Sequence, residues 1–354
     1  MIILDRYIAK MILQSTAIVM FFLVALFTFI TYVDQLGDVG QGSYGAIQAA
    51  EYVLLIIPRI VYQMFPIAVL VGAIIGLGML ANSNELTVIR AAGVSIKRII
   101  LSVMKVGIFL IVIVIIIGEW IAPVSERYAQ VFRSVALSNS LAIGKIYGVW
   151  ARDGLKFVNI QKVLPEGKLG GVNIYELDET RKLNKLIQAK VAYYINDNWV
   201  LEDVTEAQIG TDSINVQRYQ SREWSTSLSP DLLSIVIVKP ETLSIIGLYQ
   251  YIEHLHENEL DASRYELAFW SKIVLPIVTG VMIFLAIPFV FGSLRSVSIG
   301  QRIMVGTFVG IFFYIINQVF GYVGLVYHFN IMLSAVLSAI GFFLFAVYKV
   351  RKIY

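Results

Sequence analysis

A short polar island, residues 82–93, lies between two long apolar runs and carries the side chains best suited to contact another protein. Its residue types predict a helix, because Asn82 can cap the first turn with Glu85 three residues on, and Gly93 supplies a left-handed stop. Helical spacing places charged and apolar side chains on one outward ridge. Glu85, Ile89 and Ala92 form one line of this ridge, and Leu86 and Arg90 form the next. Two interpretations remain open, a ridge that docks into a partner's groove and a polar connector at a membrane surface.

The sequence contains no phosphate-binding loop, no Gly-x-Ser-x-Gly elbow and no His-Glu-x-x-His pair. It has three histidines and no cysteine. His254 and His256 are two residues apart on a predicted helix and so point to different faces, and His328 falls in a predicted loop. The sequence therefore predicts a chain that is not an enzyme and has no metal site and no cofactor.

Hydrophobic residues make up 58% of the chain and charged residues 15%, which is the balance of an integral membrane protein. Mainly apolar runs of roughly 20 or more residues predict transmembrane helices. Six such runs occur, at residues 12–32, 57–80, 99–121, 270–291, 303–325 and 331–349. Charges within them are few. Lys105, Glu119 and Lys272 lie near span ends, where snorkelling satisfies them, so an ion relay is not indicated.

Basic residues near the span ends predict the orientation, because cytoplasmic ends carry the excess of lysine and arginine. One side holds Arg6, Lys10, Arg90, Lys97, Arg98, Arg295, Arg302, Lys349, Arg351 and Lys352. Both termini and the island are therefore expected in the cytoplasm. Residues 1–122 are predicted to form helices one to three, with the island at 82–93, and residues 263–354 are predicted to form helices four to six.

Residues 123–262 are predicted to form a separate domain outside the cytoplasm. Apolar and polar residues alternate there with the period of a strand, as at Val158 and Ile160. Turn signals follow at Gly170-Gly171, at Asn196-Asp197-Asn198 and at Thr211-Asp212-Ser213. An edge strand is expected at residues 235–238 and a connector helix at residues 244–258. The pattern indicates a sandwich, a jelly roll or a barrel without choosing among them.

Two spans present bulky apolar side chains. Helix one carries Phe22, Phe29 and Ile30 without a small-residue notch, which suits a surface against acyl chains, although plain lipid exposure is the simpler explanation. In helix five Phe312, Ile316 and Phe320 recur at i, i+4 and i+8 and so share one face.

Glycines four residues apart predict where helices touch, because they allow close backbone approach. Helix two has Gly72 and Gly76, and helix five has Gly306 and Gly310.

Short motifs at the helix ends carry a resemblance. They are Leu4-Asp5-Arg6-Tyr7-Ile8, Asp34-Gln35-Leu36, Gly40-Gln41-Gly42-Ser43-Tyr44, Gly76-Leu77-Gly78-Met79-Leu80-Ala81, Gly118-Glu119-Trp120-Ile121-Ala122-Pro123, Trp270-Ser271-Lys272-Ile273 and Phe291-Gly292-Ser293-Leu294-Arg295-Ser296-Val297. In order and spacing, over the whole chain, they resemble the lipopolysaccharide-export permeases of the LptF/LptG family, and its LptG branch more closely than LptF.

The resemblance implies an α-helical integral membrane protein with six transmembrane helices and an inserted all-β periplasmic domain, a jellyroll. It implies the permease subunit of an ABC exporter that extracts lipopolysaccharide or lipooligosaccharide from the inner membrane and passes it to a periplasmic bridge toward the outer membrane. The expected partners are the permease LptF, a dimer of the ATPase LptB, LptC and, indirectly, the LptA bridge. No nucleic acid is expected.

The resemblance also assigns residues. The island falls at the family's coupling helix, with Glu85 at the acidic position presented to the ATPase and Leu86, Ile89, Arg90 and Gly93 in the same site. Lipid is expected to enter between helix one here and helix five of the partner permease, with the reciprocal gate at helix five of this chain.

The mouth of helix one departs from the family. Relatives carry lysines there, whereas this chain has Thr31, Gly37 and Asp38. Two explanations stay open, positive charge from other residues and a substrate with a less phosphorylated core. Arg59, Arg127 and Arg133 are the candidate cations, and Arg133 is the strongest, because its forked charge suits phosphate.

Two alternatives belong to other classes. One is a permease of another lipid or lipoprotein ABC export system, and the other is a non-transporting membrane assembly scaffold. A lipoprotein-releasing permease would place its insert after the first of four helices, and a scaffold would carry a recognisable cytoplasmic output domain or nothing at all below the membrane. Neither pattern matches the predicted spans.

Overall fold

The computed structural model describes residues 2–138, 149–163, 168–178, 180, 182–195, 198–210, 213–224, 226, 240, 243–291, 298–327 and 329–352. The chain divides into two compact units. The first comprises Met1–Ser140, Ser244–Leu248 and Ser263–Tyr354, and the second comprises Leu141–Leu243 and Tyr249–Ala262.

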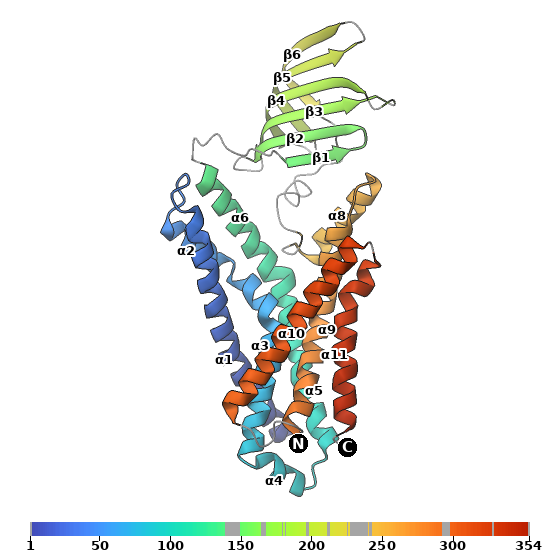
Figure 1. Cartoon of the computed structure of the whole chain (residues 1–354). Helices are drawn as coiled ribbons and strands as arrows, with labels where there is room; N and C mark the ends of the chain where they lie inside the picture. The colour runs from blue at the N-terminus through green and yellow to red at the C-terminus, as the bar shows by residue number, and fades with distance from the viewer. Residues whose placement is uncertain are drawn as a thin grey trace. The chain divides into compact units, whose positions relative to one another are not determined.

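The first unit is a bundle of helices (Figure 1). Its elements are α1 Ile2–Gln35, η1 Leu36–Asp38, α2 Ala46–Leu55, α3 Ile57–Asn82, α4 Glu85–Ala91, α5 Ile96–Ile116, η2 Ile117–Ile121, α6 Ala122–Ser138, α9 Ser263–Phe291, α10 Ile299–Val326 and α11 Ile331–Arg351. The connector helix α8, Ile245–Glu257, begins in this unit and confirms the predicted helix at residues 244–258. Among the described residues, six helical segments are long and apolar enough to cross a membrane, and they overlap the six predicted spans.

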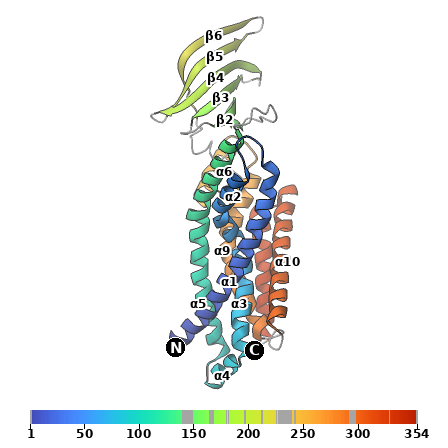
Figure 2. The same cartoon turned by 90° about the vertical axis from the view of Figure 1, so that its left-hand side faces the viewer.

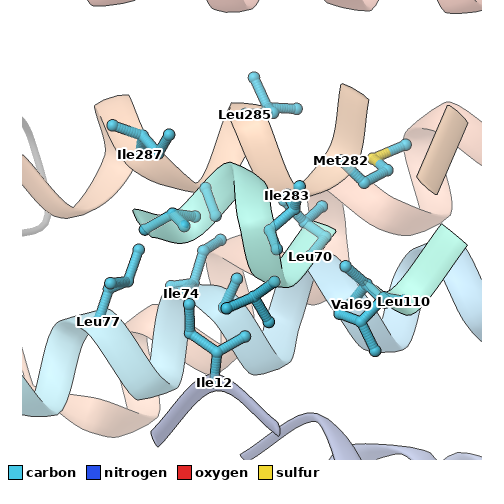
Figure 3. Packing of buried hydrophobic residues seen from close by; sticks show 14 of the residues in the cluster. Ile12, Val69, Leu70, Ile74, Leu77, Leu110, Met282, Ile283, Leu285 and Ile287 are labelled. Atoms are coloured by element: carbon cyan, nitrogen blue, oxygen red, sulfur yellow. The ribbon is translucent and has the colours of Figure 1, made fainter. Parts of the chain in front are cut away.

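Helix α3 is the centre of the bundle and packs against α1, α9 and α10. Its most apolar stretch is 83% buried, against 6% for that of α1, so α3 is a core helix and α1 a peripheral one. Side chains from α1, α3, α5 and α9 meet in one buried cluster that includes Ile12, Ile74, Leu110 and Ile283 (Figure 3).

The third span is longer than the sequence predicts. Helix α5 continues through the π-helical turn η2 into α6 and ends at Ser138, whereas the span was expected to end at Ile121, before Pro123. A proline removes a single backbone N–H, and the wide turn just before it already departs from the regular hydrogen-bond ladder. The helix therefore continues past the proline.

The second unit contains an antiparallel sheet whose strands pair in chain order. The strands are β1 Val149–Asp153, β2 Lys156–Val163, β3 Leu169–Leu177, β4 Leu183–Ile195, β5 Asn198–Ile209 and β6 Ile214–Trp224. Val158 and Ile160 are buried in the core of this sheet, which confirms the strand period. Ile195 pairs with Asn198 and Ile209 with Ile214, so antiparallel strands flank two of the predicted turns, while residues 196–197 and 211–212 themselves lie outside the described residues. The edge strand expected at residues 235–238 lies outside the described residues.

One turn prediction was wrong. Gly170 and Gly171 lie inside β3 and do not separate two strands. Gly171 has a φ of +66°, a backbone conformation that glycine adopts without strain, and the side chain of Gln161 occupies the place where a Cβ would stand.

Glycines mark the closest helix contacts of the bundle, as the sequence predicts. Gly72 and Gly76 receive α1, since a Cβ at Gly76 would lie 2.8 Å from the carbonyl oxygen of Met11. On the other side of α3, a Cβ at Gly310 would lie 2.9 Å from Ile67 Cγ2, and one at Gly306 would lie 3.2 Å from Ile74 Cδ1. Close backbone approach therefore joins both α1 and α10 to α3.

These contacts predict the effect of a single methyl group. Gly76→Ala forces that methyl into the Met11 backbone and is expected to lower the free energy of unfolding by about 2 kcal/mol. Gly341→Ala on α11 is the control, because no atom of the described residues, apart from its chain neighbours and its own helix backbone, lies within 4 Å of its new Cβ. Thermal unfolding of the purified variants in nanodiscs measures both. Equal melting temperatures for the two variants would contradict the α1–α3 contact.

Candidate functional site

The helix predicted in the polar island exists as α4, at the end of the bundle that also holds both chain termini (Figures 1 and 2). Its start differs from the prediction. Asn82 is the last residue of α3, and Asn84, with a φ of +59°, precedes Glu85 as the N-cap. The apolar run of α3 carries that helix to Asn82, and asparagine tolerates the left-handed conformation that the turn needs.

The end of α4 agrees with the prediction. Gly93 has a φ of +86°, and the Val94 N–H donates to the Ile89 carbonyl at 3.3 Å. This bond is the long hydrogen bond of a glycine-terminated helix.

The faces of α4 are only partly as expected. Leu86 is buried in the bundle core and Ile89 is partly buried against it, so Leu86 does not belong to an outward ridge. Val88, which the sequence analysis did not select, is 67% exposed, and Arg90 is exposed as expected. Thr87, Val88 and Ala91 share one exposed face of α4, and Arg90, two residues from Val88, is exposed on another.

Glu85 is bound within its own chain. The Tyr7 hydroxyl donates to Glu85 Oε2 at 2.7 Å, and the Ser83 hydroxyl donates to Glu85 Oε1 at 2.8 Å. The first bond joins α4 to the beginning of α1. Sequence reasoning missed Tyr7, because no spacing rule relates residues this far apart in the chain.

Asp5 joins the same end of α1 to α5. Its carboxylate accepts hydrogen bonds from Arg98 Nη2 at 2.9 and 3.0 Å, from Ser102 Oγ at 2.5 Å and from Lys105 Nζ at 2.8 Å. Lys105 is thus an ion-pair partner of Asp5, although the sequence prediction had it snorkelling. The first turns of α1 are therefore bonded to both helices that flank Gly93, to α4 through Tyr7 and to α5 through Asp5.

The second half of α1 carries the apolar surface that the sequence predicts. Phe22 and Phe29 are each 65% exposed, and Ile30 is exposed beside them. Further exposed apolar side chains of this half are Ile18, Phe21, Leu26, Phe27 and Val33. In the chain as described, this half of α1 faces outward.

The apolar face of α10 is rotated from the predicted one. Phe312 is exposed and lies 6.3 Å from the Phe342 ring of α11, whereas Ile316 and Phe320 are partly buried. The most exposed apolar side chains of α10 are Met304, Phe308, Tyr322 and Val326. The line of Phe312, Ile316 and Phe320 therefore lies at the edge of the exposed face of α10. The reason is that Gly306 and Gly310, on a different side of this helix, contact α3.

Two of the three candidate rim cations, Arg59 and Arg133, have acidic partners. Arg133 Nη2 donates to Asp38 Oδ2 at 2.5 Å, and its guanidinium lies 5.6 Å from the Tyr52 ring centroid. Burial raises the pKa of Tyr52 above its ordinary value. Arg59 lies 3.5 Å from Glu126, a carboxylate buried to 1% exposure. Arg127 is exposed.

Two further cations, Lys272 and Arg302, are buried, although the sequence analysis expected Lys272 to snorkel. Lys272 Nζ donates to the Gly118 carbonyl of the π-helical turn at 2.9 Å and lies 3.5 Å from Glu119. The other oxygen of Glu119 accepts the Ile245 N–H, at the start of α8. Arg302 is fully buried and donates to the Gly78 carbonyl of α3. Both cations join separate helices, which fits the rule that buried charges are paired or hydrogen-bonded.

The comparisons with known proteins cover almost the full length of the chain. A family model described as lipopolysaccharide export system permease LptF/LptG matches residues 6–352. The chain is 40% identical over 353 residues to the lipopolysaccharide export system permease protein LptG of Escherichia coli (strain K12), covering 99% of this chain and 98% of that protein. It is 41% identical over 341 residues to LptG of Haemophilus influenzae (strain ATCC 51907 / DSM 11121 / KW20 / Rd), covering 96% and 95%. Similarity to LptF of Escherichia coli (strain K12) is weaker, at 25% over 137 residues, or 39% of this chain and 37% of that protein.

The buried and exposed sides of α4 predict different losses of stability for two alanine substitutions. Leu86→Ala removes a buried side chain and is expected to lower the free energy of unfolding by about 2 kcal/mol or more. Val88→Ala shortens an exposed side chain and is expected to change it by less than about 0.5 kcal/mol. Thermal unfolding of the isolated permease chain measures both. A larger loss for Val88→Ala would mean that α4 is turned the other way.

Proposed function

The chain belongs to the lipopolysaccharide export system permease LptF/LptG family, and we propose that it extracts lipopolysaccharide from the inner membrane and passes it to a periplasmic bridge toward the outer membrane. As a permease of this export system it is a transport subunit rather than an enzyme. One observation carries the proposal: the identity to LptG extends over 99% of the chain, helices and sheet alike.

The proposed orientation places the end of the bundle that holds α4 in the cytoplasm. Lysines and arginines concentrate at that end, at Arg6, Lys10, Arg90, Lys97 and Arg98, as the positive-inside rule expects. Residues 123–262, which contain the sheet, are then periplasmic. The antiparallel sheet with its one buried core is compatible with part of a jellyroll, which remains our proposal for this domain.

We propose that a second permease, LptF, lies beside this chain, with a dimer of the ATPase LptB below it and LptC with the LptA bridge beyond. The similarity to LptF and the name of the export system support a partnered permease. We assign ATPase binding to α4, through the exposed Val88 and Arg90 and the acidic start of the helix at Glu85. A carboxylate at a helix N-terminus also favours the helix itself. Val88→Asp should then lose the ATPase during co-purification while the permease stays folded; full recovery of the ATPase would contradict docking through α4.

We assign lipid entry to the outward half of α1, against the fifth span of the partner permease, with α10 of this chain forming the reciprocal wall. Phe22, Phe29 and Ile30 offer acyl chains a wide apolar surface, and exposed contiguous apolar surface of this kind marks membrane or partner contacts. Phe312, Ile316 and Phe320 belong to the wall on α10.

Arg133 and Arg59 are our candidates for the anionic head of the substrate. Each has an acidic partner in the free chain, Asp38 for Arg133 and Glu126 for Arg59. A phosphate that binds Arg133 has to replace or share its bond with Asp38. This competition favours a substrate whose head bears fewer phosphates at this mouth, or one bound mainly through its acyl chains.

The route predicts where substrate crosslinks form. A photo-reactive residue at Phe29 is expected to capture lipopolysaccharide in the assembled exporter, because this side chain is 65% exposed on the proposed entry wall. Leu337 on α11 is the control, since it is 47% exposed and equally far along its helix from the proposed outer end. Capture is measured with labelled lipopolysaccharide before and after ATP addition. Equal capture at both positions would contradict entry along α1.

A further inference from the structure

Helix α1 has the form of a continuous rod. Its 34 residues contain neither glycine nor proline, the usual causes of a kink, so it spans about 50 Å without a built-in hinge. The rod is bound in its first half and exposed in its second. Ile8 and Ile12 are fully buried, while Phe22 and Phe29 are mostly exposed.

The backbone of this rod lies against two glycines of α3 between its ends. Gly76 receives the backbone of Met11, and Gly72 receives the backbone of Thr16. Beyond this crossing the longer arm contacts the bundle through side chains such as Val19, Leu23 and Val24 and not through its backbone. A straight helix of this kind can tilt about its closest backbone contact. The arm that reaches Phe29 is about twice as long as the arm that reaches Tyr7, at 1.5 Å per residue, so a small shift at Tyr7 gives a larger one at Phe29.

The short arm is attached to α4. Tyr7 donates to Glu85 Oε2 at 2.7 Å, and a hydrogen bond to a carboxylate is stronger than one between neutral groups. The Ser83 hydroxyl donates to the other carboxylate oxygen of Glu85, so hydrogen bonds within its own chain hold this carboxylate in one orientation. Asp5 binds α5 on the far side of the turn at Gly93. The first turns of α1 therefore follow α4 and the start of α5 when these move.

We propose that Tyr7 is a positioning residue for export, whose hydrogen bond to Glu85 transmits movement of α4 along α1 to the lipid-facing surface at Phe22 and Phe29. The inference rests on the proposed function, because it requires α4 to receive the movement of the ATPase. It adds a role for Glu85: this carboxylate organises its own chain through Tyr7 in addition to facing a partner.

The test uses the complete exporter, both permeases with the ATPase, reconstituted in liposomes that contain lipopolysaccharide. Tyr7→Phe removes one hydroxyl from a side chain that is 39% exposed, so the complex is expected to assemble and to retain its melting temperature. Lipopolysaccharide released per ATP hydrolysed is expected to fall about fivefold, the usual effect of one lost hydrogen bond. Tyr348→Phe is the matched control, because the Lys352 ammonium lies 4.7 Å over its ring and phenylalanine preserves that contact.

A double-mutant cycle separates this role from a general structural one. In a Glu85→Ala background, Tyr7→Phe is expected to have no further effect, since its acceptor is already absent. An additional fivefold loss there would overturn the proposal, and so would a release ratio for Tyr7→Phe equal to that of Tyr348→Phe in the native background.

A distance measurement tests the proposal without the need for substrate. The chain has no cysteine, so Phe29→Cys and Ile340→Cys give a single spin-label pair between α1 and α11. The distance between the labels is expected to change on nucleotide binding, and this change is expected to disappear with Tyr7→Phe. A change that persists in Tyr7→Phe overturns the inference, whereas a native exporter that releases no lipopolysaccharide overturns the proposed function alone.

Discussion

Close backbone approach between helices is the constraint on which this bundle depends. In a bilayer the hydrophobic effect does not push helices together, because lipid tails are as apolar as the side chains. Association then comes from tight packing and from polar bonds. Gly72 and Gly76 of α3 admit α1, and Gly306 and Gly310 of α10 admit the isoleucines of α3. The central helix is thereby held on two sides by contacts that a single methyl group would disturb.

The polar bonds of the bundle supply the rest of the attachment, and they are unevenly distributed along α1. Asp5 and Tyr7 fasten its first turns to α5 and α4, while the apolar side chains around Phe22 and Phe29 remain exposed. Both properties fit the role proposed for α1. A bound end can receive movement, and a free apolar face can contact acyl chains without losing packing contacts inside the bundle.

Periodicity and composition predicted the parts of the fold that depend on local sequence. Long apolar runs marked the spans, alternation at Val158 and Ile160 marked a strand, and Gly93 marked the end of α4. Predictions failed where tertiary contacts decided the outcome. Helix α3 extended through Asn82 and displaced the expected cap, and burial against the core turned Leu86 inward.

The candidate site was predicted less completely than the fold, for the same reason. The exposure of Phe22 and Phe29 followed from the lack of a packing notch in helix one. The bonds of Glu85 to Tyr7 and of Arg133 to Asp38 join distant parts of the chain, and only the folded bundle brings them together. One amino-acid sequence contains no spacing rule for such pairs, so the electrostatic partners of the candidate cations could not be foreseen.

The most direct test of this account is the accessibility of spin labels along α1 in the assembled exporter. Labels at Ile12, Phe22 and Phe29 are compared for collision with oxygen, which is concentrated in the bilayer interior, with and without lipopolysaccharide in the membrane. The account predicts low accessibility at Ile12 in both conditions. It predicts high accessibility at Phe22 and Phe29 that falls when lipopolysaccharide is present. Accessibility at Phe22 and Phe29 that is as low as at Ile12, or that is unchanged by lipopolysaccharide, would contradict a lipid-facing role for the second half of α1.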